Sequence, residues 1–463
     1  MKLKKIIAFM ASAAMLATTL SGCGDNKEVA GKINIKVGMW PNESQTESYE
    51  RMEKMRADFM AKYPDINVIP DNLGQDPQAF KLKAGAGQLP NLFKPWLTEF
   101  SQIVANGYVA DITEIADKNG YLSALNPDLK DFVTGPDGKL YGLLTEPSVQ
   151  GLYCNKRLFQ EAGLVNEDGS IKTPSTYLEV AEYAKIIKEK TGKAGFTIAT
   201  TENSGGWLFL NIAWSHGVEF SEQNSDGTWK ATFDTPEMRN ALQYMKDLKW
   251  KYDAVVDANA VSQLDMYQYF GTYQAGMMIA NPPCNYLTSF YDMNIDDIYV
   301  TRVPEGPAGR TSQIGANVWM FSAESTPEQI DACMKWLEFA YGYSVNVSEE
   351  QLANMASLYE TQISNNQIIT DQEPVDIWIN QELIEKTRAL RQKYTNVKHE
   401  NYENYYGFEG VMIKPEPRVC AQELYAIVDK CIQEVFTNPD ADIDALVTTA
   451  ANDFQVNHLD KIR

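Results

Sequence analysis

The residue whose type and position point most directly to a chemical step is Cys23, which follows an N-terminal leader. Lysines at positions 2, 4 and 5 give this leader a positive start, and an apolar run covers residues 6–20. The run is too short to span a bilayer, so it is typical of a secretory signal rather than a membrane helix. Small residues stand directly before the cysteine. We expect residues 1–22 to be removed and the Cys23 thiol to be acylated.

The stretch Leu20-Ser21-Gly22-Cys23 resembles the bacterial lipobox, in which the acylated cysteine becomes the first residue of the mature chain. The alternative is an ordinary signal peptide with an accidental cysteine. Residues 23–32 are mostly polar and are interpreted as a tether. Two or three acyl chains anchor a protein stably where a single chain does not. The sequence therefore predicts an extracytoplasmic protein that a lipid anchor holds at the cell membrane.

Charge and composition restrict the partners of this 463-residue chain. Its formal net charge is −21, and removal of a leader that carries three lysines and no acid makes the mature chain more acidic still. A surface this negative argues against nucleic acid as a partner. A hydrophobic fraction of 44% and an aromatic fraction of 11% exclude disorder and allow a large core. The length predicts two or three domains.

Residues suited to catalysis or metal binding form no recognisable site. Besides Cys23 the chain has five cysteines, an odd number, and no two of them form a Cys-x-x-Cys pair. We therefore expect neither a zinc centre nor a dense disulfide framework, and we expect no cofactor. Asp440, Asp442 and Asp444 imitate the start of a calcium loop, but alanines replace its glycine and its final glutamate. These acids are predicted to lead into the last helix.

The residues give little support to an enzyme. The chain has only three histidines and no Gly-x-Ser-x-Gly turn, which argues against a serine hydrolase. A glycoside hydrolase needs only two carboxylates, and among 62 acids nothing singles out a pair. Two possibilities therefore stay open at this point: a secreted glycoside-hydrolysing lipoprotein, and a glycan-binding module without a transporter.

The start of the mature chain predicts the element that would position a ligand. Alternating apolar residues at 33–37 indicate a strand, helical spacing follows over 49–63 until Pro64, and 66–69 returns as a strand. This β-α-β unit is typical of a mostly parallel sheet flanked by helices. In such sheets ligands lie beyond the carboxyl ends of the strands. The first strand end is followed by the candidate residues Trp40, Asn42 and Glu43.

One helix can be predicted from its caps alone. Thr326 followed by Pro327 and Gln329 forms a capping box, and Gly342 marks the end. Cys333 lies on the apolar stripe of this helix, so it is interpreted as a core residue.

Several motifs then follow in an order that resembles a known family. They are Phe93-Lys94-Pro95-Trp96-Leu97-Thr98-Glu99-Phe100, Asp137-Gly138-Lys139-Leu140-Tyr141-Gly142, Tyr153-Cys154-Asn155-Lys156 with Ala162-Gly163-Leu164, Phe270-Gly271-Thr272-Tyr273-Gln274-Ala275-Gly276-Met277-Met278, and Val303-Pro304-Glu305-Gly306-Pro307 before Gly315-Ala316-Asn317-Val318-Trp319. Together they resemble the maltose-binding-protein-like, family 1 solute-binding proteins of bacterial ABC sugar importers. The resemblance covers roughly residues 33–345 and weakens beyond.

The resemblance implies a two-lobed α/β fold of the periplasmic-binding-protein type, with a mostly parallel sheet in each lobe and a helical C-terminal region. Lobe 1 would comprise 33–144 and 303–341, and lobe 2 would comprise 145–302 and 342–463. Crossings would lie near 144–147, 301–304 and 341–347. The expected function is non-enzymatic. A monomer would bind a carbohydrate, and we favour an oligosaccharide, between the lobes and deliver it to the membrane permease.

A sugar presents an apolar face and a rim of hydroxyls, so its site needs aromatic platforms and fixed polar groups. The resemblance places Trp96 for stacking, and Glu99 and Glu146 as hydrogen-bond acceptors. A loop with a dense aromatic run at 401–408 is expected to reach the ligand through Tyr405 and Tyr406. Trp207, Phe209 and Trp214 are instead interpreted as one buried helix face. Further candidates are Lys94, Asn281, Asn285, Asn317 and Trp319, although the family's glycine-tryptophan pair is absent around Asn281.

Overall fold

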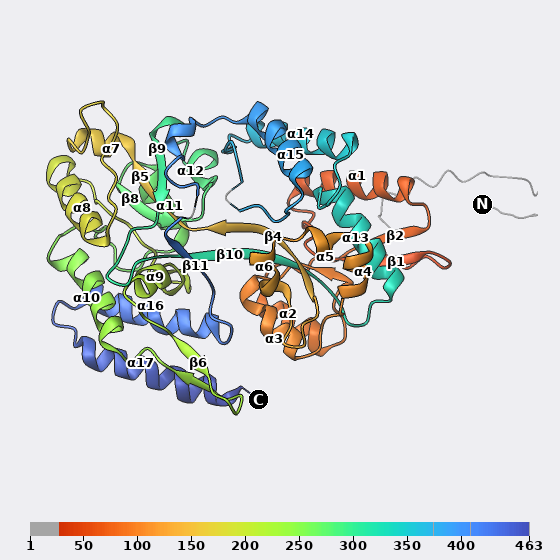
Figure 1. Cartoon of the computed structure of the whole chain (residues 1–463), viewed down its shortest axis with the longest axis horizontal. Helices are drawn as coiled ribbons and strands as arrows, with labels where there is room; N and C mark the ends of the chain where they lie inside the picture. The colour runs from red at the N-terminus through yellow and green to blue at the C-terminus, as the bar shows by residue number, and fades with distance from the viewer. Residues whose placement is uncertain (1–26, 374, 408, 463) are drawn as a thin grey trace, which may run out of the picture.

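The computed structural model describes residues 27–373, 375–407 and 409–462. It forms two α/β lobes that lie side by side and are joined by long strands (Figure 1). The predictions for the leader and for Cys23 lie outside the described residues. Within the described part of the chain, no helix is both long and apolar enough to cross a membrane.

Lobe 1 is built on the β-α-β unit that the sequence predicts. β1 (Ile33–Val37) pairs in parallel with β2 (Ile66–Pro70), and α1 (Thr46–Lys62) connects them. The order of the sheet is β11-β10-β3-β1-β2, and β4 pairs with the other side of β10. The remaining elements of this lobe are α2 (Pro77–Gly85), β3 (Leu92–Phe93), α3 (Phe100–Ala105), α4 (Thr113–Lys118), α5 (Tyr121–Ala124), α6 (Pro127–Lys130) and α13 (Pro327–Tyr341).

Helix α13 shows why local sequence predicts a helix well. The Thr326 side chain accepts from the backbone N–H of Gln329, the Gln329 side chain bonds back, and Gly342 ends the helix in the left-handed conformation with φ of 64°. These bonds satisfy backbone groups that a helix end leaves unpaired. Cys333 is fully buried on this helix. The prediction for this segment is confirmed.

Two antiparallel strands carry the chain between the lobes. β4 (Gly142–Val149) pairs with β10 (Arg310–Phe321), and the register shifts between Gly315 and Asn317. One end of β10 pairs with β3 in lobe 1, and its other end pairs with β11 (Val411–Pro415). Glu146 in β4 has φ of 54°, in the left-handed region. Both strands are therefore irregular where they pass from one lobe to the other.

The sheet of lobe 2 differs from the prediction. β5 (Gly151–Asn155) lies between β8 (Met277–Ala280) and β9 (Ile298–Arg302), and both pairings are antiparallel. Parallel pairing is limited to isolated bridges such as Thr197 with Met278. The two-lobed α/β fold is confirmed, but the sheets are mixed rather than mostly parallel. This lobe also contains a short hairpin of β6 (Ser221–Gln223) and β7 (Trp229–Ala231). Its helices are α7 (Lys156–Glu161), α8 (Tyr177–Thr191), α9 (Ser204–Ser215), α10 (Pro236–Trp250), α11 (Gln263–Gly271), α12 (Tyr286–Ser289), α16 (Ala421–Thr437) and α17 (Ile443–Asn457).

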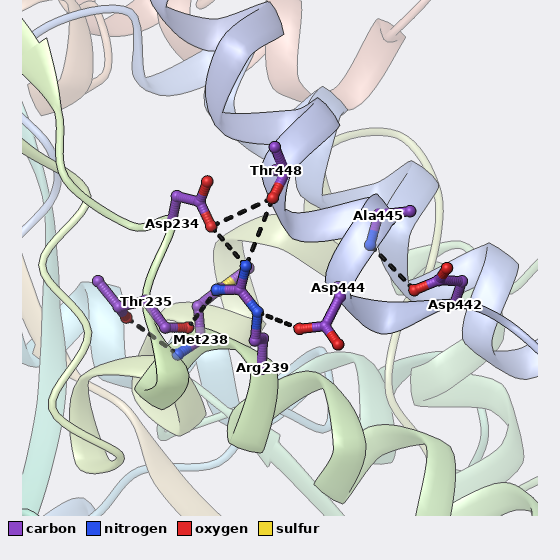
Figure 2. A network of polar contacts seen from close by, with 8 residues as sticks. All are labelled: Asp234, Thr235, Met238, Arg239, Asp442, Asp444, Ala445 and Thr448. Atoms are coloured by element: carbon purple, nitrogen blue, oxygen red, sulfur yellow. Dashed lines mark hydrogen bonds and ion pairs between the residues drawn. The ribbon is translucent and has the colours of Figure 1, made fainter.

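The acidic run at residues 440–444 leads into α17 and caps it, as predicted. The Asp442 carboxylate caps α17 by accepting from the backbone N–H of Ala445 at 3.0 Å. Asp444 pairs with Arg239 on α10, which also binds Asp234 at 2.7 Å (Figure 2). This network fastens α17 to α10 across the base of lobe 2.

The boundaries between the lobes depart from the expected positions. Val303 is fully buried in the core of lobe 2, and the backbone N–H of Ala308 bonds to the Ser215 carbonyl of α9. The chain therefore leaves lobe 2 within β10, not at 301–304. Tyr343 and Val345 pack into the core of lobe 1. Both residues lie within the range expected for the third crossing, 341–347, so the position of that crossing stays a prediction.

The C-terminal region adds a helix pair where the lobes meet. α14 (Glu349–Ser364) and α15 (Gln381–Tyr394) pack together, and both lie beside the crossing strands (Figure 1). Lys62 at the end of α1 pairs with Glu350 at 2.7 Å, which ties α14 to lobe 1. Beyond α15 the chain returns to lobe 2 through β11 and α16.

Candidate ligand-binding cleft

The loops that follow the carboxyl ends of β2 and β3 border a small hollow in lobe 1, with an enclosed volume of about 10 Å³. Aromatic, acidic and amide side chains occur together there: the lining includes Gln75, Asp76, Phe80, Lys94, Trp96 and Glu99. This is the position at which open α/β sheets bind ligands. The structure thus brings Lys94, Trp96 and Glu99 together at one hollow, and their contact with a ligand stays a prediction.

Trp96 supplies a flat apolar surface. Its side chain stands at the start of a 3₁₀ turn, Leu97–Glu99, and the residue is 39% exposed. Its backbone bridges to Asn317 of β10, so the position of the residue is fixed by the crossing strand. An exposed indole held rigidly at a cleft can stack against the apolar face of a sugar ring.

A chain of polar contacts includes Asn317, the residue to which the Trp96 backbone bridges. The Asn317 amide N–H donates to the Glu146 carboxylate at 2.5 Å, and the Asn317 amide oxygen accepts from Gln75 at 2.5 Å. Lys94 pairs with the same carboxylate at 3.3 Å. The Glu146 side chain is nevertheless 60% exposed, so its carboxylate retains open acceptor positions. These contacts hold an anionic acceptor in one orientation without covering it.

Lobe 2 contributes an acid to the opposite wall. Glu416 lies between β11 and α16, and its carboxylate accepts from the Trp207 indole N–H at 2.8 Å and from the Tyr425 hydroxyl at 3.2 Å. Burial raises the pKa of Glu416 to about 7, the two hydrogen bonds oppose this rise, and the negative charge of Glu99 adds to it. Acids from both lobes therefore act on one another across the junction.

Glu99 has a similar environment on its own side. Burial raises its pKa, with a further rise from the charge of Glu423 and an opposing effect from Lys81. Because Glu99 belongs to lobe 1 and Glu423 begins α16 of lobe 2, this acid faces the second lobe. Carboxyl groups in such surroundings bind hydroxyl donors well and disfavour anions.

Three aromatic residues that the sequence suggested for ligand contact are packed inside the lobes instead. Trp40 is 5% exposed and stacks on Trp336 with ring centroids 5.8 Å apart. Trp319 is 2% exposed, because the Tyr341 ring and the Lys94 ammonium cover it. Tyr405 is 1% exposed. These side chains support the cleft from behind and offer a ligand no surface.

Tyr405 also has a specific structural partner. Its hydroxyl donates to the Val149 carbonyl of β4 at 2.6 Å, which braces the crossing strand. The neighbouring Tyr406 stacks against His399. The aromatic loop thus supports the junction between the lobes, and Phe408 of the same run lies outside the described residues.

The remaining amide and acidic candidates are spread over the junction. The Asn285 amide oxygen accepts from the backbone N–H of Ile368 at 2.8 Å, so this residue anchors the segment after α14. Asn42 and Glu43 are exposed just before α1. The half-buried Asn281 lies next to Gly315, and its amide oxygen has no hydrogen-bond partner among the described residues. Of this group, Asn281 is the one with an unused polar atom near the crossing strands.

Sequence reasoning missed Gln75, Trp207 and Glu416. Trp207 was interpreted as core with Phe209 and Trp214, and those two are buried while Trp207 is only half-buried and bonds to Glu416. Glu416 stands between two prolines just before a helix, which was a usable signal for a fixed acid in a loop. No such pattern of neighbouring residues singles out Gln75.

Comparison with known proteins decides the family. The model of the family described as bacterial extracellular solute-binding protein matches residues 42–345. The chain belongs to this family. An arabinooligosaccharide-binding protein of Bacillus subtilis (strain 168) is 24% identical over 408 residues, covering 83% of this chain and 84% of that protein. An sn-glycerol-3-phosphate-binding periplasmic protein, UgpB, of Brucella abortus (strain 2308) is 27% identical over 173 residues, which cover 34% of this chain and 39% of the relative.

Solved structures share the fold. Maltose-bound MalE3 of T. maritima has a TM-score of 0.64 at 19% identity, covering 91% of this chain and 99% of that one. UgpB from Mycobacterium tuberculosis, in complex with glycerophosphocholine, has a TM-score of 0.68 at 14% identity, covering 92% and 98%. At these identities the likeness establishes the two-lobed fold of this solute-binding protein.

Proposed function

We propose that this solute-binding protein is the lipid-anchored substrate-binding component of an ABC importer and binds a carbohydrate between its lobes. The observation that carries the proposal is that Asn317 of β10 holds two residues, the exposed Trp96 through a backbone bridge and the Glu146 carboxylate through its amide. An aromatic face and an oriented acceptor held by one crossing strand suit the two kinds of surface that a sugar presents. The relative named as arabinooligosaccharide-binding supports a carbohydrate, and an oligosaccharide in particular.

Electrostatics support a carbohydrate over the phosphate ligands named for other relatives. The negative charge of Glu99 adds to the rise that burial causes in the pKa of Glu416, and Lys94 is already paired with Glu146. Bringing a phosphate into such surroundings sets like charges together. Neutral hydroxyls instead donate to these acids.

The mechanism that we propose is binding and release without chemistry. Two lobes joined by irregular strands allow closure around the sugar, and the bound sugar favours the closed form only if it contacts both lobes. A monomer carrying acyl chains on Cys23 would hold the cleft close to the permease. No catalytic step is required for delivery.

A ligand screen tests this proposal. Thermal unfolding of the intact soluble chain is measured with neutral oligosaccharides, monosaccharides, sn-glycerol-3-phosphate and amino acids, because a ligand that binds only the native state raises the melting temperature. We expect a rise with one neutral oligosaccharide, recovered intact by chromatography. A rise with the phosphate ester alone would contradict the carbohydrate assignment, and cleavage of the sugar would favour the glycoside hydrolase.

A further inference from the structure

The N-terminus of helix α9 is capped from α16 rather than from its own sequence. In the described part of the chain, the side chain of the N-cap residue, Asn203, makes no capping bond to α9. Asp429 of α16 takes that role, because its two carboxylate oxygens accept from the backbone N–H groups of Asn203 at 2.8 Å and of Gly206 at 2.7 Å. A negative group is favoured at this position, since the helix dipole is positive at the N-terminus.

Both oxygens of Asp429 are needed for this cap. The residue is only 5% exposed, and a buried charge is costly unless it is hydrogen-bonded. Burial raises the pKa of Asp429, and the backbone N–H groups of Gly206 and Asn203 oppose that rise. Two donors meet two acceptor oxygens, so the loss of one oxygen would leave a backbone N–H at the start of α9 without its partner.

Two glycines allow α16 to approach α9 this closely. A side chain at Gly205 would place its first carbon 2.5 Å from Oδ1 of Asp429, and one at Gly206 would place it 2.4 Å from the Tyr425 carbonyl oxygen. Non-bonded atoms pack best at about 3.5–4.0 Å, so neither position has room for a side chain. The two helices lie side by side in lobe 2 (Figure 1). This close packing sets the position of α9 immediately before Trp207.

Trp207 carries the effect of this packing to Glu416. Its indole N–H donates to the Glu416 carboxylate at 2.8 Å, and the Tyr425 hydroxyl of α16 donates to the same group at 3.2 Å. Helix α16 therefore fixes both donors of Glu416, since Tyr425 belongs to it and Trp207 follows the helix start that Asp429 caps.

The Trp207 ring also reaches a strand that joins the lobes. A side chain on Gly315 of β10 would come within 3.8 Å of this ring and within 3.5 Å of the Asn281 amide nitrogen. Two residues further along β10, Asn317 holds the Glu146 carboxylate. The half-buried Trp207 ring thus lies at the junction, where a ligand held between the lobes would meet it.

We propose that Asp429 is a positioning residue, which sets the Trp207 indole for ligand binding by fixing the start of α9. The carboxylate is buried and does not itself meet the ligand. It acts through Trp207, and Trp207 in turn orients Glu416. The inference rests on the proposed carbohydrate function, because its effect on affinity requires a sugar between the lobes.

A spectroscopic test needs no ligand. The indole nitrogens of the nine tryptophans are isotope-labelled in the intact soluble chain, and the magnetic resonance signal that Trp207→Phe removes is assigned to Trp207. In Asp429→Asn only one acceptor oxygen remains, so we expect this signal to shift as the bond to Glu416 changes. Asp442→Asn is the matched control. Asp442 caps α17 with one oxygen, which asparagine retains, so the Trp207 signal should not move (Figure 2).

A double-mutant cycle measures the effect on binding. Calorimetry with arabino-, xylo-, malto- and cello-oligosaccharides compares Asp429→Asn, Trp207→Phe and the double variant with the wild type. We expect Asp429→Asn alone to lower affinity about tenfold, and Asp442→Asn to leave it unchanged. Because Asp429 acts through Trp207, the same change made in Trp207→Phe should lower affinity by less than about twofold, since residues that act as one unit are not additive.

Two results would overturn the inference: an unmoved Trp207 signal in a folded Asp429→Asn variant, and an equal loss of affinity in both backgrounds. Thermal unfolding checks that each variant folds. Asp429→Ser also lacks the carboxylate and replaces Asp429→Asn if that variant does not fold. If no sugar binds any form, the proposed function fails, whereas the indole signal still decides whether Asp429 positions Trp207.

Discussion

Glu99 of lobe 1 raises the pKa of Glu416 in lobe 2, so the two walls of the cleft are electrostatically coupled. Burial is the larger cause of the rise, which brings the pKa of Glu416 to about 7. The donors Trp207 and Tyr425 hold the carboxyl group in place. The cleft therefore contains an acid whose charge changes near neutral pH, and this has consequences for stability and for binding.

Glu416→Gln should change how stability depends on pH. A raised pKa means that the folded chain binds this proton more tightly than the unfolded chain, so its contribution to stability is present below about pH 4.5 and is lost as pH rises to about 7. Glutamine does not titrate, so the variant does not lose this stability as the pH rises. We expect its free energy of unfolding, relative to the wild type, to rise by about 1–3 kcal/mol across this window.

Urea unfolding at several pH values measures this difference. Glu237→Gln, an exposed acid on α10, is the matched control and should follow the wild type at every pH. Parallel pH profiles for Glu416→Gln and the wild type would show that Glu416 titrates as an ordinary exposed acid.

Trp96→Ala should weaken sugar binding without unfolding the protein. The ring is 39% exposed, so little core packing is lost, whereas a stacked sugar loses a contact worth about 1 kcal/mol or more. We expect affinity to fall about tenfold by calorimetry. Phe290→Ala removes an aromatic side chain that is 74% exposed on lobe 2 and should leave affinity unchanged. An equal effect of both substitutions would place the platform elsewhere.

Glu146→Gln should weaken binding while preserving shape. The change removes the negative charge that Lys94 and Asn317 hold in place, and charge-assisted hydrogen bonds are about twice as strong as neutral ones. Calorimetry should show a reduced affinity for the sugar and an unchanged stoichiometry. Glu161→Gln breaks an exposed pair with Arg157 on α7 and serves as the control. If the two variants bind alike, Glu146 is not a ligand acceptor.

Cys23→Ser should release the protein from the membrane, because the thiol is the predicted site of acylation. Fractionation of cells that express the full chain measures the release, and the wild type should stay with the membrane. Membrane association of the variant equal to that of the wild type would place the anchor elsewhere.

The fold could be predicted from the sequence where local signals are strong. The β-α-β unit and helix α13 follow from apolar periodicity and from caps, which act within a few residues. The direction of the strands in lobe 2 depends on pairing between distant segments, such as β5 with β8 and β9. Neighbouring residues do not encode that pairing, so the mixed sheets were not foreseen.

The sequence indicates which loops border the candidate site, but it does not indicate which of their side chains are buried. Asn317 and Trp319 are two residues apart on β10 and therefore point to the same side of the strand. Asn317 bonds to Gln75 and Glu146, whereas the Tyr341 ring covers the indole of Trp319. Trp40 follows a strand end that the fold directs toward the cleft, and it turns onto Trp336 instead. Which aromatic ring is covered depends on helix α13, a long way along the chain.

Ligand binding should close the two lobes without any chemical change in the ligand. Small-angle X-ray scattering of the soluble chain, with and without the neutral oligosaccharide that most raises the melting temperature, tests it most directly. Because a ligand shifts a two-state protein only toward the form that it binds more tightly, the complex should have a smaller radius of gyration. Chromatography of the same sample should return the sugar intact. An unchanged radius at saturating sugar would contradict closure and favour a rigid glycan-binding module.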